Sequence, residues 1–334
     1  MKPLSVLIRI NMSLYPLKFT PLYKYRIWGG EKLKTVLHKN YQEDHIGESW
    51  EISDVKGDQT VVGEGILEGK TLKSLIEEYK EDVVGKTVYN AFGTDFPLLI
   101  KFIDAKTPLS IQVHPSNEIA KERHNSFGKN EMWYVMEAEK DAELIVGFNQ
   151  QVDKASYIQA LKSGNILNVL NNDIVSKGDT YYIPTGRIHA IGAGVMLAEI
   201  QQTSDITYRI YDYERVDAAT GKTRELHTEQ AVDVIDYSVS DSYKTKYTKP
   251  DNDTNTLVNS PYFKTNIVNV KGEMTKDYSA LDSFVIYICV EGELDLLWND
   301  ASYKIVKGET VFLPAAIDSV TLKSSNADVL EVYY

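Results

Sequence analysis

The segment LSIQVHP carries polar side chains at alternate positions of a strand-like run. Successive side chains of an extended strand point to opposite faces, so Ser110, Gln112 and His114 share one face. Glu131 opens the next clear run of strand character, and His189 follows a Pro-Thr-Gly turn. Two histidines and a glutamate that leave a position for water or substrate are typical of a catalytic rather than a structural zinc site. We therefore predict one divalent-metal site, with His114, Glu131 and His189 as ligands and the Gln112 oxygen as the candidate fourth.

An internal repeat weighs against the alternative that these are core histidines and a surface acid. Residues 177–191, KGDTYYIPTGRIHAI, and residues 307–320, KGETVFLPAAIDSV, share a lysine, a glycine, an acid, a threonine, two bulky residues, an aliphatic residue and a proline in the same order. Similar strands, EMWYVMEAE and FVIYICVEGE, precede the two copies. Two copies of one β-unit predict two barrels of the same type.

The two copies differ at the candidate ligands. Without gaps His189 aligns with Ser319, or with Asp318 if the second turn is one residue shorter. When the preceding strands are matched at their tyrosines, Glu131 aligns with Phe284. Residues that the copies share would build the barrels, and residues that they do not share are candidates for chemistry. We expect the metal in the first barrel and none in the second.

The rest of the chain predicts a mainly β protein with short inserted helices. Runs such as DHIGESWEIS and FPLLIKFIDA are typical of strands. Residues 71–83 and 153–170 instead carry apolar side chains at helical spacing, and Thr71 is a candidate cap for the first of them. Residues 240–256 are polar, as in a linker, and predict a domain boundary.

These features divide the chain into three parts. Residues 1–16 would be an extension. Its first part, residues 1–11, does not have the pattern of a signal peptide, because Arg9 interrupts its apolar stretch and no cleavage site follows. We expect this part either to be disordered or to lie before a true start at Met12. Residues 17–245 would form the catalytic barrel with both helical insertions. Residues 246–334 would form a second, metal-free barrel.

Composition restricts the partners of this chain. The formal net charge is -12 and the pI is near 5.1, so neither nucleic acid nor an anionic membrane is an expected partner. No apolar run approaches the roughly 20 residues that span a bilayer. The single cysteine, Cys289, excludes an internal disulfide and a thiolate zinc cluster, and it suits a reducing cytoplasm. If the substrate is anionic, cations must be concentrated locally.

Several strings together resemble one known family. QVHP, the glutamate of NEMWYV, PTGRIHAIG and SDITYRIYDY are similar to the type I mannose-6-phosphate isomerases (phosphomannose isomerases) in their short bacterial form. YKYRIWGG and GESWEIS fit as well, and the resemblance runs from about residue 17 to residue 334. It implies tandem cupin-type jelly-roll barrels and a zinc-dependent, cytoplasmic enzyme, monomer or homodimer. That enzyme would interconvert two small molecules, D-mannose 6-phosphate and D-fructose 6-phosphate.

The resemblance also implies site residues. The family's zinc ligands, one ion per chain, correspond to the four residues listed above, its active-site arginine to Arg209, and positions near its substrate to Lys101 and Ser110. Lys101 stands in an apolar run, where an unpaired ammonium is costly to bury, unless it snorkels at a strand end. Arg209 could hold a phosphate or stabilise an oxyanion, or it could form a structural ion pair with Asp205 or Asp212.

Other positions are weaker candidates. Glu199 is a candidate site carboxylate, and Glu48 and Trp50 alternate onto one face that either lines the pocket or packs it. Longer family members carry a lysine soon after the HP pair, where this chain has Ser116 and Asn117. Lys121 is therefore a candidate for the second phosphate contact.

The implied reaction moves a proton between C1 and C2 through a cis-enediol. It needs a base near both carbons and a cation where the carbonyl oxygen becomes negative. We expect zinc and Arg209 to stabilise the enediolate while Lys101 and Ser110 help to hold the phosphate. The base candidates, in order, are Glu199, a metal-bound water and His45.

Three alternatives remain open on the sequence. A cupin-type iron dioxygenase uses similar ligands, usually with a third histidine in place of Gln112. A metal-dependent glucose-6-phosphate isomerase and a non-catalytic sugar-binding cupin are the others.

Overall fold

The computed structural model describes residues 14–218 and 220–334. The expectations for residues 1–11 and for a start at Met12 lie outside the described residues. Further along the predicted extension, Leu14 is buried and the Tyr15 hydroxyl donates to the Glu64 carbonyl oxygen at 2.8 Å. Leu17 then forms an isolated bridge with Phe312, far along the chain.

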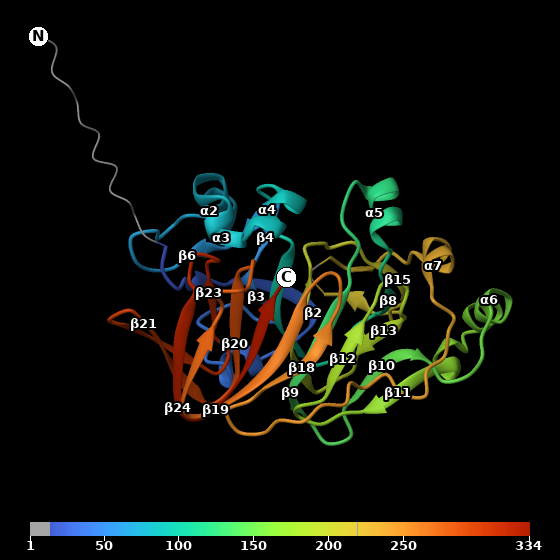
Figure 1. The fold of residues 1–334 in the computed structure, drawn as a ribbon. Coiled ribbons are helices and arrows are strands. Elements are labelled where there is room, and N and C mark those ends of the chain that lie inside the picture. Colours follow the sequence, from blue (N-terminus) through green and yellow to red (C-terminus); the bar gives the residue numbers. More distant parts are fainter. Residues whose placement is uncertain (1–13, 219) are drawn as a thin grey trace, which may run out of the picture.

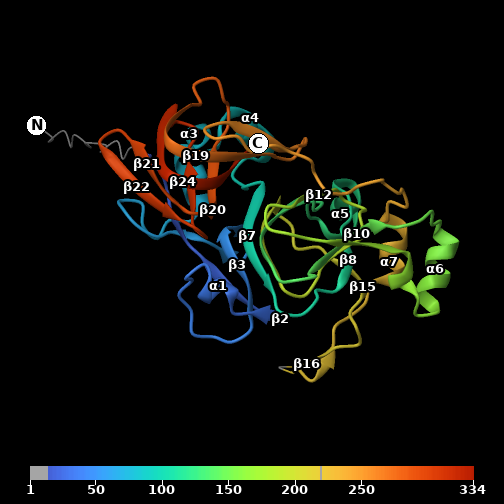
Figure 2. The ribbon, with the colours of Figure 1, turned by 90° about the horizontal axis from the view of Figure 1, so that it is seen from below.

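The first barrel consists of two facing antiparallel sheets (Figure 2). One has five strands in the order β11 (Leu170–Ile174), β10 (Glu143–Phe148), β13 (His189–Ile191), β8 (Ile111–Val113) and β15 (Tyr208–Tyr211). The other has six in the order β12 (Thr180–Ile183), β9 (Glu131–Ala138), β14 (Val195–Gln202), β7 (Leu98–Ala105), β2 (Leu22–Gly30) and β3 (Ile46–Ile52). Apolar side chains from both sheets pack between them, Trp133, Val146 and Leu197 among them.

The second barrel is built from the C-terminal strands, orange and red in Figure 1. Its path is β18 (Thr254–Asn259), β19 (Lys264–Asp277), β24 (Ser319–Tyr333), β20 (Val285–Glu291) and β23 (Thr310–Leu313). Off this path, β21 (Glu293–Trp298) pairs with β24 and with β22 (Ala301–Val306). The expectation of a mainly β protein with two barrels is confirmed.

An apolar interface joins the two barrels. Phe96, which precedes β7, lies 4.8 Å from Phe284 and 5.8 Å from Phe312 of the second barrel between ring centroids. All three rings are fully buried. Each buried side chain of this size contributes roughly 1.5–3 kcal/mol, so the second barrel stabilises the wall that carries Lys101.

Strand pairing corrects the alignment of the two sequence copies. Glu131 pairs with Ile183 of β12, and Val285 pairs with the equivalent Leu313 of β23. Glu131 therefore corresponds to Val285 and not to Phe284. A slip of one residue reverses the face of a strand, so the tyrosine-based match was wrong. Val285 lies in the apolar interior of the second barrel, whereas Phe284 lies between the barrels.

The two segments with helical spacing contain helices. Thr71 caps α2 (Leu72–Tyr79) by accepting a hydrogen bond from the Ser74 amide. Short helices α3 (Glu81–Val84) and α4 (Lys86–Phe92) follow, separated by residues with positive φ at Lys80 and Gly85. The second segment holds α6 (Lys154–Lys162) and the 3-10 helix η1 (Ile166–Val169).

Four helices have no counterpart in the sequence predictions: α1 (Lys32–Thr35), α4, which begins beyond the end of the first predicted segment, α5 (Asn117–His124) and α7 (Thr228–Val234). In α5 and in α7 one residue each is buried, Ala120 and Ala231, so neither shows a repeating apolar face. None of the helices in residues 14–218 and 220–334 has the length and apolar character to cross a membrane.

Two-residue ribbons complete the fold: β1 (Phe19–Thr20) with β6 (Val61–Val62), β4 (Asp54–Val55) with β5 (Asp58–Gln59), and β16 (Val216–Asp217) with β17 (Lys222–Thr223). The polar stretch before the second barrel lies on the first one. The Tyr243 hydroxyl donates to the Phe148 carbonyl oxygen at 3.1 Å, and the Tyr247 hydroxyl donates to that of Gly178 at 2.6 Å.

Candidate active site

Two strands of one sheet and one of the other bring the predicted metal ligands together inside the first barrel. His189 begins β13 and pairs with Gln112 of β8, and His114 follows β8 directly. Glu131 begins β9 in the opposite sheet. One ligand atom from each of His114, Glu131 and His189 lies within 4.8 Å of the others, and all three residues are buried.

Backbone carbonyls hold both histidine rings with Nε2 facing the site. The His114 Nδ1 lies 2.9 Å from the Ile206 carbonyl oxygen, and the His189 Nδ1 lies 2.8 Å from that of Arg187. A carbonyl oxygen can only accept, so each Nδ1 carries the hydrogen and each Nε2 presents a lone pair. Metal-binding histidines are oriented by such contacts.

These atoms fit a cation. The Nε2 atoms of His114 and His189 are 3.1 Å apart, and Glu131 Oε1 lies 3.2 Å from the Nε2 atom of His189. Within the described residues this buried carboxylate oxygen has no hydrogen-bond partner. A buried carboxylate oxygen without a partner is costly, and Lys129 contacts only the other oxygen of Glu131, so a cation facing Oε1 and the imidazole lone pairs would remove this cost. The Gln112 amide lies 3.2 Å from His189 Nε2, and turning it over would present its oxygen as a fourth ligand.

The protonation of the ligands also suits a metal. Burial lowers the pKa of His189 to about 3 and the pKa of His114 well below its ordinary value. Both imidazoles are therefore neutral at pH 7, which is the form that binds metals. Burial raises the pKa of Glu131, so its ionised form needs a nearby cation.

Lys129 is a site residue that the sequence predictions did not include. Its Nζ donates to Glu131 Oε2 at 2.7 Å and lies 3.1 Å from His114 Nε2. Burial would lower the pKa of Lys129, but the Glu131 and Glu199 carboxylates hold it above its ordinary value. A signal was available, because Lys129 stands two residues before Glu131 and strand alternation favours a common face.

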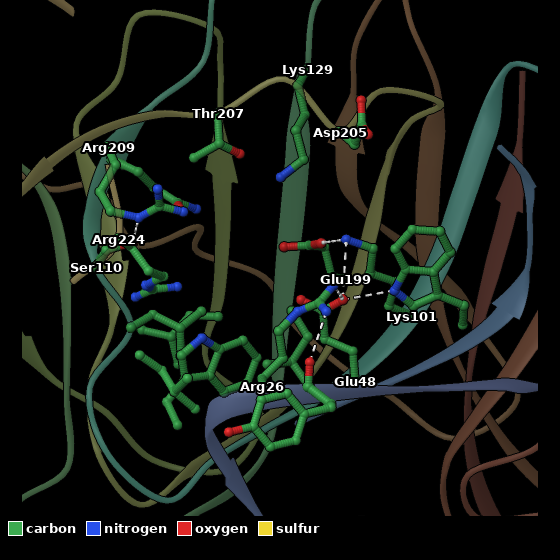
Figure 3. A pocket seen from close by; sticks show the side chains of 18 of the residues that line it. Arg26, Glu48, Lys101, Ser110, Lys129, Glu199, Asp205, Thr207, Arg209 and Arg224 are labelled. Atoms are coloured by element: carbon green, nitrogen blue, oxygen red, sulfur yellow. Dashed lines mark hydrogen bonds and ion pairs between the residues drawn. The ribbon is translucent and has the colours of Figure 1, made fainter. Parts of the chain in front are cut away.

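An ion-pair network forms another wall of the pocket (Figure 3). Lys101 Nζ lies 3.2 Å from Glu199 Oε1 and 4.0 Å from Glu48 Oε2, and Arg26 donates to the same Glu48 oxygen at 2.8 Å. Strand register places these groups, because Lys101 of β7 pairs with Glu199 of β14 and with Trp50 of β3. Lys101 is 7% exposed, so it is a buried, paired lysine and does not snorkel.

Indole groups complete this wall. The Trp50 Nε1 donates to Glu48 Oε2 at 2.7 Å, and the Trp133 Nε1 donates to Glu199 Oε2 at 2.9 Å. The pocket has a volume of about 450 Å³. Its lining includes Glu48, Trp50, Lys101, Ser110, Gln112, Lys129, Glu199 and Arg209.

Replacing Glu48 by glutamine is expected to destabilise the fold by about 3 kcal/mol at pH 7. Burial alone would raise the pKa of Glu48, but Lys101 and Arg26 overcome it and lower the pKa from 4.5 to about 2. Because the folded-state pKa is the lower one, this stabilisation is complete above pH 4.5 and is lost as the pH falls towards 2. Urea unfolding of the native protein and of Glu48→Gln at decreasing pH should show that the difference between their free energies of unfolding becomes smaller. A difference that widens on acidification would contradict the assignment.

Arg209 of β15 stands beside the ligands, since it pairs with Gln112 of β8. Its Nε donates to Ser110 Oγ at 3.2 Å and its Nη1 to the Glu225 carbonyl oxygen at 3.0 Å. Among the described residues Arg209 forms no ion pair with Asp205 or Asp212, so the structure does not support the alternative of a structural ion pair.

Other sequence candidates lie elsewhere. His45 and Lys121 are not among the residues that line the pocket. Lys121 donates to Asn125 Oδ1 at 2.6 Å on α5. The Ser116 side chain caps α5 by accepting a hydrogen bond from the Ile119 amide.

Two family models match the chain. The model described as phosphomannose isomerase type I, catalytic domain, matches residues 16–150, and the one described as mannose-6-phosphate isomerase, cupin domain, matches residues 253–333. The chain is 35% identical to mannose-6-phosphate isomerase ManA of Bacillus subtilis over 93% of its length and 97% of the relative's. It is 34% identical to the mannose-6-phosphate isomerase of Streptococcus mutans, with 88% and 90% covered.

Solved structures agree with these matches. The crystal structure of mannose 6-phosphate isomerase from Bacillus subtilis superposes with a TM-score of 0.85 at 33% identity, covering 96% of this chain and 99% of that one. A putative mannosephosphate isomerase from Archaeoglobus fulgidus shares the fold at 22% identity, with a TM-score of 0.76 over 97% and 99% of the two chains.

The jelly-roll barrels and the His/Glu group inside the first of them define a cupin-type protein with a candidate metal site. This chain belongs to the type I phosphomannose isomerase family.

Proposed function

We propose that this chain is a zinc-dependent enzyme that interconverts D-mannose 6-phosphate and D-fructose 6-phosphate through a cis-enediol. The observation that carries the proposal is the convergence of two neutral histidines and a buried glutamate beside a pocket lined by Lys129, Glu199 and Arg209. Relatives that are 32–35% identical over most of the chain bear the name of this activity.

Gln112, His114, Glu131 and His189 would hold the metal. When bound there, a divalent ion supplies a Lewis acid that polarises substrate oxygens. The remaining chemistry is the proton transfer between the two carbons, which the side chains of this chain must carry out.

Glu199 is the proposed base. Lys101 and Lys129 overcome the effect of burial and lower the pKa of Glu199, so it is a carboxylate that can accept a proton from C2 of the aldose and return one to C1. Lys129 is an ammonium held by Glu131; it can donate a proton to the carbonyl oxygen on C1 and take one back from the hydroxyl on C2, so that it ends the reaction as an ammonium. Arg209 adds a fixed positive charge beside Gln112, where the enediolate oxygens would be negative.

A coupled assay tests the function. Purified protein should turn over mannose 6-phosphate, lose at least about 100-fold in rate after chelation of the metal, and recover when zinc is added back. Faster turnover of glucose 6-phosphate than of mannose 6-phosphate would identify the protein as a glucose-6-phosphate isomerase. Copurifying iron with oxygen consumption would indicate a dioxygenase, and binding of hexose phosphate with no turnover of any would indicate a sugar-binding cupin.

A further inference from the structure

The side chains of one half of the pocket carry no net positive charge among themselves. Three cationic side chains line it, and each has a carboxylate partner. Lys129 pairs with Glu131 at 2.7 Å, Lys101 with Glu199 at 3.2 Å, and Arg26 with Glu48 at 2.8 Å. Asp205 also lines the pocket and adds a further acid (Figure 3). A phosphate dianion brought to this half would have to displace a buried carboxylate from its lysine or arginine, so Lys101 is a poor phosphate ligand.

In the other half of the pocket, guanidinium groups outnumber the carboxylates that they contact. Arg224 donates from Nε to Asp212 Oδ2 at 2.8 Å and from Nη2 to Oδ1 at 2.6 Å, and Arg215 donates to the same Oδ1 at 2.5 Å. Two guanidinium groups therefore share one carboxylate, while Arg209 beside them has none within the described residues. Two acids lie at the edge. Asp217 lines the rim and accepts from the Tyr25 hydroxyl, and Glu225 follows Arg224 in the chain.

Unused donors converge on this side. In the described part of the chain, Nη1 of Arg224 and Nη2 of Arg209 have no hydrogen-bond partner. Ser110 Oγ accepts from Arg209 Nε, so its own hydrogen is available to donate. Figure 3 shows these three residues together on one side of the pocket, with Glu48, Lys101 and Glu199 on the other. Burial and the charge of Arg224 lower the pKa of Arg209, a repulsion that an anion between the two groups would relieve.

We propose that Arg224 is the residue that anchors the substrate phosphate, with Ser110 and the free edge of Arg209, and that Lys101 is not. This inference rests on the proposed function. Guanidinium groups bind phosphate through paired, charge-assisted hydrogen bonds, which suits two arginines and a hydroxyl. Ser110 stands two residues before Gln112, roughly 7 Å along a strand, so a phosphate held there leaves the carbonyl end of the sugar beside the metal ligands.

The chain offers a matched control for this test. Arg215 precedes the β16–β17 ribbon and Arg224 follows it, and both bind Asp212. Arg224 lines the pocket, whereas Arg215 does not. Arg215→Ala therefore removes one guanidinium from Asp212 without removing a phosphate donor, and Arg224→Lys keeps the charge while losing the planar fork.

The probes are mannitol 6-phosphate, which lacks a carbonyl and cannot be turned over, and mannitol, which lacks the phosphate. Calorimetric titration should show about 100-fold weaker binding of mannitol 6-phosphate to Arg224→Ala and an intermediate loss for Arg224→Lys. Arg215→Ala should stay close to the native protein. The KM for mannose 6-phosphate should rise with the dissociation constant, and kcat should change much less.

Equal affinity of Arg224→Ala and Arg215→Ala for mannitol 6-phosphate would overturn the anchor. The anchor would also be overturned if Arg224→Ala weakened the binding of mannitol as much as it weakened the binding of mannitol 6-phosphate, while Arg224→Lys kept full affinity for both. If Arg224→Ala fails to fold, the lysine variant decides by the same comparison. Native protein that binds mannitol 6-phosphate through Arg224 but isomerises no mannose 6-phosphate would refute the proposed function and leave the anchor standing. If Arg224→Lys and Arg224→Ala both isomerised mannose 6-phosphate with the KM of the native protein, the proposed function would stand and the anchor would be refuted.

Discussion

Replacing His189 by asparagine is expected to lower kcat roughly 1,000-fold and to release the bound metal. The amide nitrogen of asparagine takes the place of Nδ1 and can still donate to the Arg187 carbonyl oxygen, which accepts from His189 at 2.8 Å. Asparagine has nothing at the position of Nε2, the atom that faces His114 and Glu131. The variant therefore removes one ligand while keeping the contact that orients the residue.

Metal content by mass spectrometry and steady-state turnover are measured on the same samples. His124→Asn is the matched control, because the ring of His124 contacts the Tyr208 hydroxyl and is not among the pocket-lining residues. It should keep a full metal complement and native turnover. A His189→Asn protein that retains one metal ion per chain and most of its kcat would show that the metal, if any, lies elsewhere.

Replacing Arg209 by alanine is expected to lower kcat about 100- to 1,000-fold with a smaller change in KM. Its guanidinium stands beside Gln112 and is held by Ser110 and the Glu225 carbonyl oxygen, so it is fixed before substrate binds. Under the proposed function, a fixed charge beside the enediolate would stabilise the transition state more than the ground state, and its loss would therefore appear in kcat.

Comparison with Arg224 separates the two arginines. Both line the same half of the pocket, but Arg209 pairs with Gln112 of β8, whereas Arg224 is bound to Asp212. We expect a large kcat effect at Arg209, together with the smaller rise in KM that the loss of one phosphate donor brings, and a KM effect with little change in kcat at Arg224. If Arg209→Ala kept most of its kcat and raised only KM, its role would be binding alone.

Local geometry explains what could be predicted. Ser110, Gln112 and His114 alternate on one short segment, and strand periodicity alone puts them on one face. Glu131 and His189 were found because their types match the same ligand set and because the second copy lacks them. The same alternation points to Lys129, two residues before Glu131, which the sequence predictions did not include.

Neither the register of the strands nor the ion-pair partners of the charged residues could be predicted from the sequence in this way. Matching tyrosines shifted the second copy by one residue, because sequence similarity does not show which residues of neighbouring strands pair. Lys101 was expected to hold the phosphate, but in the structure its partners are Glu199 and Glu48. Arg224 was not predicted as a site residue, since nothing in the sequence around it shows that its side chain reaches the pocket.

The sequence by itself determined the chemistry that is available: a His/Glu/Gln set of candidate metal ligands, two barrels of one type, and a lysine inside an apolar strand. The tertiary structure decided how the charges are divided, with Lys101, Lys129 and Arg26 neutralised on one side and Arg209 and Arg224 left in excess on the other. The reason is physical. Ligand types and strand alternation are local properties, whereas ion pairs join strands that are distant in the chain and depend on register, burial and side-chain reach.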